Sequence, residues 1–494
     1  MSNALGRSVA RAQKDAGGAA ALIARDPGAA ADACYDVVII GGGIYGAMLL
    51  LEATRAGLHA ALLERGDFGE ATSSNHLRII HGGLRYLQTL DLPRFTVSVR
   101  ERRWFLRTFP DLVAPLRCVM PLYGEGLRRI SIMRGALRLN DLLSVRRNRG
   151  VRADRRLARS CMMEPDLVCQ HFPVVARKGL QGAAVWYDAL MLHPNRILIE
   201  VLRWACAYDA RALNYVEALE LVEERGVVCG VRGRDRQSGR EHTFRARVVV
   251  NAAGPWVRAW ARQAHQDMRD LFRPSLAWNV QFDRPSLGEG ALAVKPLGVG
   301  RRTYFLTSWA GKLVAGTGHA PCEEVGSSQP QPPEVELQAF LRDLNEALPD
   351  LGLRPDAIER IYAGYLPAER TEPLVLADRP VMIDHGLQGG PSGFVSLSGV
   401  KYTTARAVAE HTVHYLLKRY LDSGLRPSRL GPPPSVRTTY RLDDAGDAWP
   451  IEWTRIVAEE AVQHPDDLVY RRTDWSDHPV HLAQHFSTVA SLFE

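Results

Sequence analysis

Two stretches of the chain combine residue types that could carry chemistry. The first covers residues 70–86 and mixes hydroxyl side chains, two histidines, two arginines and a pair of glycines. Short hydroxyl side chains let a ligand approach the backbone, arginines bind anions, and a histidine exchanges a proton near neutral pH. The candidate residues in this stretch are Thr72, Ser73, Ser74, Arg78, His81, Gly82, Gly83, Arg85 and Tyr86.

The second stretch is a loop at residues 398–404, which precedes a helix-forming run at residues 405–417. The N-terminus of such a helix offers unpaired backbone N–H groups and the positive end of the helix dipole. A loop of this kind is common by itself, and its lysine could act as a base only if its pKa were lowered. The candidate residues are Gly399, Val400, Lys401, Tyr402 and Thr403.

These residues need a scaffold, and residues 36–46 predict one. A short buried strand leads into a G-x-G-x-x-G turn formed by Gly41, Gly43 and Gly46, and a helix-forming run follows. Such glycines permit a tight turn, close approach of the backbone to a pyrophosphate, and close helix–strand packing. Glu64 ends the next apolar strand, where an acid suits a ribose 2′-hydroxyl. A glycine-rich turn alone is the alternative, but the four features together indicate an unphosphorylated adenine dinucleotide.

A second strand and turn lie at residues 248–256, where three valines precede Asn-Ala-Ala-Gly-Pro-Trp. Small residues at the end of a buried strand let the backbone contact a nucleotide that lies over the sheet. The candidate residues are Ala252, Gly254 and Trp256. Asn251 and Gly254 are interpreted as shaping the turn rather than as catalytic groups.

The order of these motifs resembles that of the flavin-dependent glycerol-3-phosphate dehydrogenases, within the D-amino-acid-oxidase-like flavoprotein superfamily. The matching motifs lie at residues 72–74, 80–86, 248–256 and 398–404, and the resemblance covers about residues 35–475. It implies FAD as the cofactor and an α/β fold with a discontinuous Rossmann-like FAD-binding domain, an antiparallel-sheet substrate domain and a C-terminal helical cap. The implied reaction converts glycerol 3-phosphate to dihydroxyacetone phosphate, with quinone or O₂ as the electron acceptor.

The resemblance also implies roles for single residues. Arg85 and Tyr86 would face a small anionic or polar metabolite, and Arg379 resembles a second substrate arginine. Arg78 would lie close to the isoalloxazine, and Lys401 would border the substrate while the backbone amides around it reach the flavin. Asp188 stands where the family has an acid beside the following helix.

Three departures from the family pattern concern the substrate. Leu366 stands where the family has an arginine, and losing this donor should weaken the binding of a phosphate monoester. Asn279 stands where the family has a histidine, and an amide cannot accept a proton at neutral pH. The turn at residues 316–319 ends in His319 rather than an aspartate, so His81 and His319 are the alternative bases.

With 494 residues, the chain is long enough for two or three domains. The Ala-rich first residues lack a periodic apolar face and predict a mobile tail rather than a targeting peptide. The expected division is a tail at 1–34, an FAD-binding domain at 35–125, 181–260 and 361–420, a substrate domain at 126–180 and 261–360, and a helical cap at 430–494.

The composition is that of an ordinary globular protein, with 46% hydrophobic and 24% charged residues. The seven cysteines contain no C-x-x-C pair, which indicates reduced thiols in the cytoplasm and no zinc site. No run approaches the roughly 20 apolar residues of a membrane span. Nucleic-acid binding is not expected because no known module is present. A homodimer is compatible with the sequence.

Residues 126–156 form the most basic segment, with ten arginines against Asp141 and Asp154. Apolar residues within it are spaced as in an amphipathic helix, and such a helix can lie on an anionic membrane surface. This predicts peripheral contact with the inner face of the cytoplasmic membrane, which would suit quinone as the acceptor. A solvated arginine-rich face over the protein's own core is the equally weighted alternative.

Two other functions are compatible with the motifs. Residues 73–80 faintly resemble the flavin-proximal segment of sarcosine-oxidase-like enzymes, which would imply an amine or amino-acid oxidase in which His76 could tether the flavin covalently. The other is a flavin-binding membrane-surface protein that has lost its catalytic function. Anaerobic flavin bleaching by a polar metabolite would eliminate the second alternative.

Overall fold

The computed structural model describes residues 22–124, 126–264, 267–296, 302–421 and 449–477, together with 433, 483, 486, 487, 489, 490 and 493. The chain divides into two compact units. Unit 1 comprises Met1–Ser73, His193–Arg273 and Asp378–Glu494, and unit 2 comprises Ser74–Leu192 and Pro274–Ala377. Each unit is described by itself.

Unit 1 is built on a mixed sheet whose strand order is β17-β18-β10-β1-β2-β7. Strands β18, β10, β1, β2 and β7 run parallel, whereas β17 is antiparallel to β18, and β8 and β9 extend the sheet as an antiparallel hairpin from β10. The strands are β1 Cys34–Ile40, β2 Ala60–Leu63, β7 Arg211–Leu213, β8 Val216–Glu224, β9 Val227–Asp235, β10 Glu241–Asn251, β17 Val381–Asp384 and β18 Phe394–Ser398.

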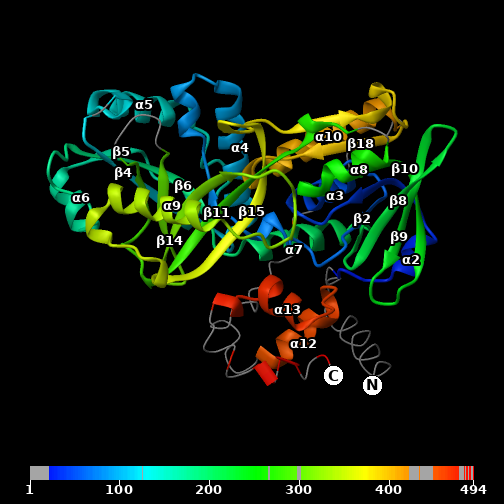
Figure 1. Ribbon diagram of the computed structural model, residues 1–494. Coiled ribbons are helices and arrows are strands. Elements are labelled where there is room, and N and C mark those ends of the chain that lie inside the picture. The colour runs from blue at the N-terminus through cyan, green and yellow to red at the C-terminus, as the bar shows by residue number, and fades with distance from the viewer. Residues whose placement is uncertain are drawn as a thin grey trace. The chain divides into compact units, whose positions relative to one another are not determined.

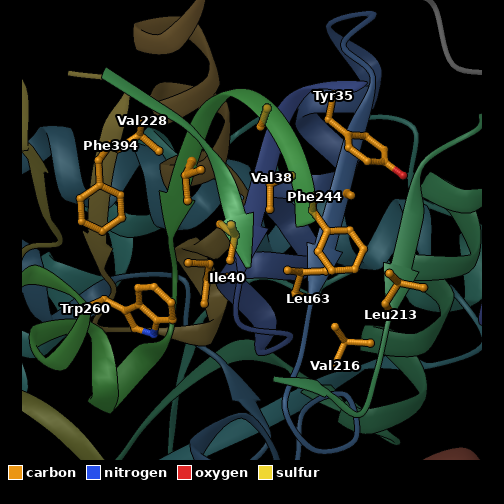
Figure 2. Packing of buried hydrophobic residues seen from close by; sticks show 14 of the residues in the cluster. Tyr35, Val38, Ile40, Leu63, Leu213, Val216, Val228, Phe244, Trp260 and Phe394 are labelled. Carbon is orange, nitrogen blue, oxygen red and sulfur yellow. The ribbon is translucent and has the colours of Figure 1, made fainter. Parts of the chain in front are cut away.

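The core of unit 1 forms where apolar side chains from the strands meet (Figure 2). Val38 and Ile40 of β1, Leu63 of β2 and Phe244 of β10 belong to one buried cluster. Near-continuous apolar strands of this kind are expected when both faces of a parallel sheet are covered. The helices of this part are α3 Ile44–Arg55, α7 Pro194–Cys206, α8 Val257–Gln263 and α10 Ala405–Arg419, and α10 lies beside α3 (Figure 1).

The parallel strands bring the sequence motifs to one edge of the sheet. Gly41 follows β1, Glu64 follows β2, Ala252 follows β10 and Gly399 follows β18. Because carboxyl ends of parallel strands meet at the same edge, these four positions lie along one rim. The predicted α/β, Rossmann-like arrangement is confirmed.

The C-terminal segment of unit 1 is helical, as predicted for a cap. It contains α12 Trp449–Glu459, α13 Pro465–Asp467 and a single π-helical turn at Leu468–Arg472. Trp453 and Trp475 pack together inside it with a centroid distance of 4.1 Å. The buried Arg472 donates from Nη1 to Asp67 Oδ2 at 2.7 Å, which fixes this segment to the loop after β2. Of the expected cap, residues 430–432, 434–448, 478–482, 484, 485, 488, 491, 492 and 494 lie outside the described residues.

The expected tail at residues 1–34 differs from the structure over residues 22–34. Helix α2 covers Pro27–Ala31, and the Asp26 carboxylate caps it by accepting from Ala29 N at 2.9 Å. Arg25 pairs with Asp235 of β9. The tail prediction is therefore wrong for this part, because an N-cap and a distant ion pair order a segment that has no apolar period. Residues 1–21 lie outside the described residues.

Unit 2 is built on a second sheet with the order β16-β15-β11-β14-β13-β12-β4-β6-β3, and β5 pairs with β6. Strand β12 forms a short parallel pair with β4, whereas β14 pairs antiparallel with β11 and β13, β13 with β12, β6 with β3, β4 and β5, and β15 with β16. The predicted antiparallel sheet is confirmed for these pairs. The strands are β3 Ile79–Ile80, β4 Val113–Leu122, β5 Cys161–Met163, β6 Gly182–Met191, β11 Arg273–Pro285, β12 Ala291–Val294, β13 Tyr304–Trp309, β14 Lys312–Pro321, β15 Ile358–Thr371 and β16 Leu374–Leu376.

The helices of unit 2 are α4 Leu92–Thr108, α5 Ile130–Leu143, α6 Pro165–His171 and α9 Glu334–Ala347. Helix α4 begins at a side-chain cap, whereas α5, α6 and α9 begin without one. Asp91 accepts from Arg94 N at 3.0 Å at the start of α4. Residues 74–125, 181–192 and 361–377, which we expected in the FAD-binding domain, belong to unit 2, because their strands pair within its sheet.

Candidate functional site

The glycine turn between β1 and α3 has no room for a side chain at Gly41 or Gly46. Gly41 adopts a φ of 106°, and a β-carbon there would lie 2.6 Å from the Ala252 carbonyl oxygen. A β-carbon on Gly46 would collide with the Gly41 carbonyl oxygen. Gly43 is the N-cap of α3 and makes no side-chain capping bond. No side chain stands on these glycines, so the backbone at the helix start suits the approach of an anionic group.

Ser73 lies at the start of α3, although it is distant from that helix in sequence. It belongs to a short 3₁₀ turn, Thr72–Ser74, and its Oγ accepts a hydrogen bond from Ile44 N at 2.9 Å. A hydroxyl that accepts in this way still has its own proton to donate. Ser73 can therefore donate a hydrogen bond to a phosphate oxygen while it accepts one from the helix terminus, which fits its predicted role.

Glu64, which follows β2, accepts hydrogen bonds from the backbone of the glycine turn and of its own loop. Its Oε2 accepts from Gly42 N at 2.6 Å, and its Oε1 accepts from Gly66 N at 2.9 Å. Burial raises the pKa of this carboxyl, while the two N–H groups act in the opposite direction. Each carboxylate oxygen retains a further acceptor site, so a partly exposed Glu64 can still accept a ribose hydroxyl.

The turn after β10 is shaped by Asn251, as the sequence predicted. Its Nδ2 donates to the Val257 carbonyl and to Ser396 Oγ, both at 2.8 Å. Beyond this turn, the Arg65 guanidinium stacks 4.0 Å above the ring of Trp256. Arg65 was not identified from the sequence, and its only signal there is its place directly after Glu64.

The loop at residues 398–404 is held by Tyr45, the second residue of α3. The Tyr45 hydroxyl donates to the Lys401 carbonyl at 2.8 Å and accepts from Val400 N at 3.0 Å and Lys401 N at 3.1 Å. Burial raises the pKa of Tyr45, so it stays a neutral donor. We expected these two amides to reach the flavin, and the structure gives them another partner.

The neighbouring tyrosine anchors the other side of the loop. Tyr402 opens a 3₁₀ turn, Tyr402–Thr404, and its hydroxyl donates to the Pro194 carbonyl at 3.0 Å. Thr403 is buried, and Ser398 Oγ is buried without a hydrogen-bond partner among the described residues. Open backbone at the glycine turn, a serine hydroxyl at the helix start and a carboxyl group beside them form a set of donors and acceptors that fits the ribose and phosphate parts of FAD.

In unit 2, His81 forms a pair with a buried carboxylate. His81 Nδ1 lies 3.3 Å from Asp188 Oδ2, and Asp188 Oδ1 accepts from Gly82 N at 2.7 Å and from Arg102 Nη1 at 2.8 Å. Burial opposes ionisation of Asp188, but the bond from His81 and the charge of Arg102 lower its pKa to about 2. A carboxylate that fixes one ring nitrogen leaves Nε2 for proton exchange. The sequence signalled Asp188 only as an acid beside a helix.

Arg85 and Tyr86 follow His81 on the same segment. Gly83, with a φ of 87°, precedes the 3₁₀ turn Leu84–Gln88 that carries both residues. The side chain of Arg85 is exposed, whereas Tyr86 is buried with its ring below the guanidinium of Arg94 at 4.8 Å. Unit 2 thus presents a proton acceptor and a cation within five residues of chain.

Arg78 is buried in unit 2, packed against the ring of Trp309. Its Nη1 donates to the Leu192 carbonyl at 3.1 Å, and its backbone N donates to His76 Nδ1 at 2.9 Å. Arg78 adopts a φ of 62°, which is uncommon for a residue with a side chain. Ser74, the remaining hydroxyl candidate, is the first residue of unit 2.

Asn279 and His319 lie on the paired strands β11 and β14. Asn279 is buried, and its Oδ1 accepts from Thr317 Oγ1 at 3.0 Å, which is the orienting role that an amide can have. Burial and the charge of Arg302 lower the pKa of His319 to about 3. A base with this pKa is poorly matched to proton transfer near neutral pH, so His81 is the better candidate.

The remaining candidates lie on β15 or on the loop after β16. Leu366 offers no side-chain donor, and its carbonyl accepts from Ser275 Oγ at 2.8 Å. Arg379 is exposed in unit 1, with Asp378 at 4.0 Å.

Among the described residues, no group of three or more His, Cys, Asp or Glu could hold a metal ion. None of the described helices combines the length and the apolar composition that a membrane span requires.

Comparisons with known proteins identify the family of the chain. The family model described as FAD dependent oxidoreductase matches residues 36–415. A glycerol-3-phosphate dehydrogenase of Synechocystis sp. is 29% identical over 84% of this chain and 74% of its own length. The mitochondrial glycerol-3-phosphate dehydrogenase of Rattus norvegicus is 28% identical over 80% of this chain, and the match spans 54% of the rat protein.

Solved structures show the same fold. A glycerol-3-phosphate dehydrogenase from Bacillus halodurans complexed with FAD has a TM-score of 0.71 at 20% identity, covering 94% of this chain and 92% of that one. An L-alpha-glycerophosphate oxidase from Mycoplasma pneumoniae with FAD bound has a TM-score of 0.56 at 15% identity, covering 81% and 98%.

Proposed function

The chain belongs to the FAD dependent oxidoreductase family, and from this premise we propose that it oxidises a small anionic secondary alcohol, with glycerol 3-phosphate as the first substrate to test. Its cofactor is FAD. The names of its relatives support the substrate, and so does the position of the exposed Arg85 beside His81. The observation that carries the proposal is the His81–Asp188 pair.

FAD, when bound, accepts the hydride that leaves the alcohol carbon. The protein must then orient the alcohol and take its hydroxyl proton. We assign the proton to His81 Nε2, because Asp188 holds Nδ1 and stabilises the imidazolium that forms. Arg85 supplies a cation for the substrate anion, and Lys401 and Arg379 are further candidates for that role.

Leu366 has a consequence for affinity. Without a guanidinium at this position the phosphate loses a bidentate donor, so glycerol 3-phosphate should bind more weakly than an arginine at that position would allow. An anionic alcohol with a smaller head, such as a hydroxy acid, is therefore included in the test panel.

We further propose that the basic segment at residues 126–156 contacts the inner face of the cytoplasmic membrane and that the electrons pass to quinone. Ten arginines and the exposed side chains of Leu142 and Val145 support a surface contact. We also propose that the protein can form a homodimer. Co-sedimentation with anionic vesicles that fails at low salt would contradict the contact, since screening is weakest there.

The decisive experiment is anaerobic mixing of the purified holoprotein with glycerol 3-phosphate, glycerol, hydroxy acids, sarcosine and an amino-acid set. Loss of the visible flavin absorbance with glycerol 3-phosphate, and not with glycerol, is the expected result. Bleaching by sarcosine or amino acids alone would overturn the alcohol substrate and favour the amine-oxidase alternative. Yellow colour that stays with the denatured protein would support a tether at His76, and colourless protein would exclude it.

A further inference from the structure

Unit 2 contains a cavity of about 840 Å³ beneath the basic segment. One wall is α5 with the turns that follow it, and the other is the run at residues 157–162, which leads into β5. Asn148 joins the two walls, because it donates to the Leu157 carbonyl at 2.8 Å and accepts from Leu157 N at 2.9 Å. Figure 1 shows α5 beside β5, against which it packs. The cavity is therefore a built feature of this unit.

The lining of the cavity is strongly cationic. Four arginines line it, while the carboxylate of Asp141 is already bound by Ser160 N at 2.9 Å and Ser160 Oγ at 3.0 Å. The lining arginines are Arg134, Arg138, Arg147 and Arg159. Three of them, Arg134, Arg138 and Arg159, have no ion-pair partner within the described part of the chain. Arg147 has one, Asp141. Clustered cations without counter-charges attract an anion.

The buried Arg147 is a second indication of an anionic ligand in the cavity. It is about nine-tenths buried, and its guanidinium reaches the Ala158 carbonyl at 3.3 Å and Asp141 Oδ1 at 3.6 Å. Its Nε is buried and has no partner among the described residues. A buried donor without an acceptor is costly unless a ligand supplies one.

Apolar side chains also contribute to the cavity lining and leave much of their surface exposed. Leu142 is 71% exposed and Val145 is 75% exposed, and both line the cavity. Ile132, Leu139 and Leu143 are exposed on the same helix. A free phosphate would use the arginines but leave these apolar groups in water. A ligand with an anionic head and an apolar tail would satisfy both.

We propose that this cavity binds the phosphate headgroup of an anionic phospholipid while Leu142 and Val145 enter the acyl region beside it. The site rests on the membrane contact proposed above and deepens it from a general surface attraction to a defined headgroup site. It does not depend on the identity of the oxidised substrate.

The test is calorimetric titration of the holoprotein with dihexanoyl phosphatidylglycerol below its micelle-forming concentration, with dihexanoyl phosphatidylcholine and inorganic phosphate as parallel probes. We expect saturable binding of phosphatidylglycerol and at least about tenfold weaker binding of the other two. Equal affinity for inorganic phosphate would overturn the lipid assignment in favour of a phosphate site. Absence of phosphatidylglycerol binding would overturn the site altogether.

Two double variants with the same change of charge separate a site from a charged surface. Arg138→Gln with Arg159→Gln removes two lining cations, whereas Arg146→Gln with Arg149→Gln removes two exposed arginines that do not line the cavity. The first should weaken phosphatidylglycerol binding about tenfold, and the second should leave it within about twofold. Equal losses would contradict a defined site.

Vesicle sedimentation completes the test. Leu142→Ser with Val145→Ser should retain calorimetric binding of the short lipid but lose co-sedimentation with mixed phosphatidylcholine and phosphatidylglycerol vesicles. Retained co-sedimentation would contradict the role of the apolar pair. Anaerobic flavin reduction is measured on every variant, so failure of the lipid site and failure of the proposed substrate give different results.

Discussion

His81 and Asp188 stand 107 residues apart in the chain, yet Nδ1 of one lies 3.3 Å from Oδ2 of the other. Strands β3 and β6 bring them together, because Ile80 pairs with Ala189 in antiparallel register. Asp188 also receives Trp186 Nε1 at 3.1 Å, so the carboxylate is held from several sides. The pair has the arrangement expected for a general base and the group that orients it.

Replacing His81 by glutamine should slow substrate reduction of the flavin by roughly 100- to 10,000-fold, because general-base catalysis typically contributes that much. His319→Gln should have little effect, since a pKa of about 3 makes that histidine a poor base. The measurement is anaerobic stopped-flow with glycerol 3-phosphate, with FAD content checked in each variant. A larger loss for His319→Gln than for His81→Gln would exclude the assignment.

Asp188 should make the stability of the protein depend on pH. Its folded pKa of about 2 lies below the ordinary value of 3.8, so its contribution is present above about pH 4 and is lost as pH falls through 2. This difference corresponds to roughly 2 kcal/mol of unfolding free energy. Urea unfolding of the wild type at several pH values from 6 down to 2 should reveal the decline.

Asp188→Asn should flatten that decline, because the variant has no carboxyl to titrate there. The exposed Asp283 in the same unit is the matched control, and Asp283→Asn should keep the wild-type slope. If both variants lose the same slope, the pH dependence has another source. Comparing differences between variants removes the contribution of the other carboxylates.

The glycine turn gives a prediction that separates binding from folding. Gly43 has a φ of −72°, which any residue can adopt, and an added β-carbon would lie 3.1 Å from Ser73 Oγ. Gly43→Val should therefore fold but bind FAD at least about tenfold more weakly. Gly46→Ala should destabilise the apoprotein by about 1–3 kcal/mol, because its β-carbon meets the Gly41 carbonyl.

Fluorescence titration with FAD and thermal unfolding of the apoprotein measure the two effects separately. Normal FAD affinity in a folded Gly43→Val protein would mean that the phosphates do not approach this turn. Normal stability of Gly46→Ala would mean that helix α3 can move away from β1.

The parts of the site that sequence could predict are those in which neighbouring residues determine the geometry. The strand–turn–helix at residues 36–46 and the turn after Asn251 follow from local apolar runs and glycine spacing. The family resemblance implied the α/β fold and the antiparallel second sheet. These features need no knowledge of distant contacts.

The parts that sequence could not predict depend on side chains far apart in the chain. Asp67, Asn214 and Arg472 form one buried cluster, with Asn214 Nδ2 at 2.8 Å and Arg472 Nη2 at 2.8 Å from Asp67 Oδ1. No local pattern relates these positions. The ordered segment at residues 22–34 is similar, because Arg25 finds its partner in Asp235 of a distant strand.

Tyr45 is the clearest case of such a distant contact, and it yields the last prediction. Its hydroxyl makes three hydrogen bonds with the backbone of Val400 and Lys401, 355 and 356 residues away. Tyr45→Phe removes all three of these bonds, while the Lys401 carbonyl keeps Thr404 N as a donor at 3.3 Å. Each lost hydrogen bond costs about 0.5–1.5 kcal/mol. The loop should therefore open more often. Deuterium exchange of the peptide covering residues 398–404 should accelerate at least about tenfold.

Tyr402→Phe is the matched control, because that hydroxyl donates to the Pro194 carbonyl, whereas the two amides donate to Tyr45. Exchange at Val400 and Lys401 should change little in this variant. If Tyr45→Phe and Tyr402→Phe accelerate exchange equally, the hydrogen bonds of Tyr45 do not specifically protect the Val400 and Lys401 amides. If Tyr45→Phe also tightens FAD binding, the tyrosine competes with the flavin for the two amides; if it weakens FAD binding, the tyrosine positions Lys401 for the cofactor.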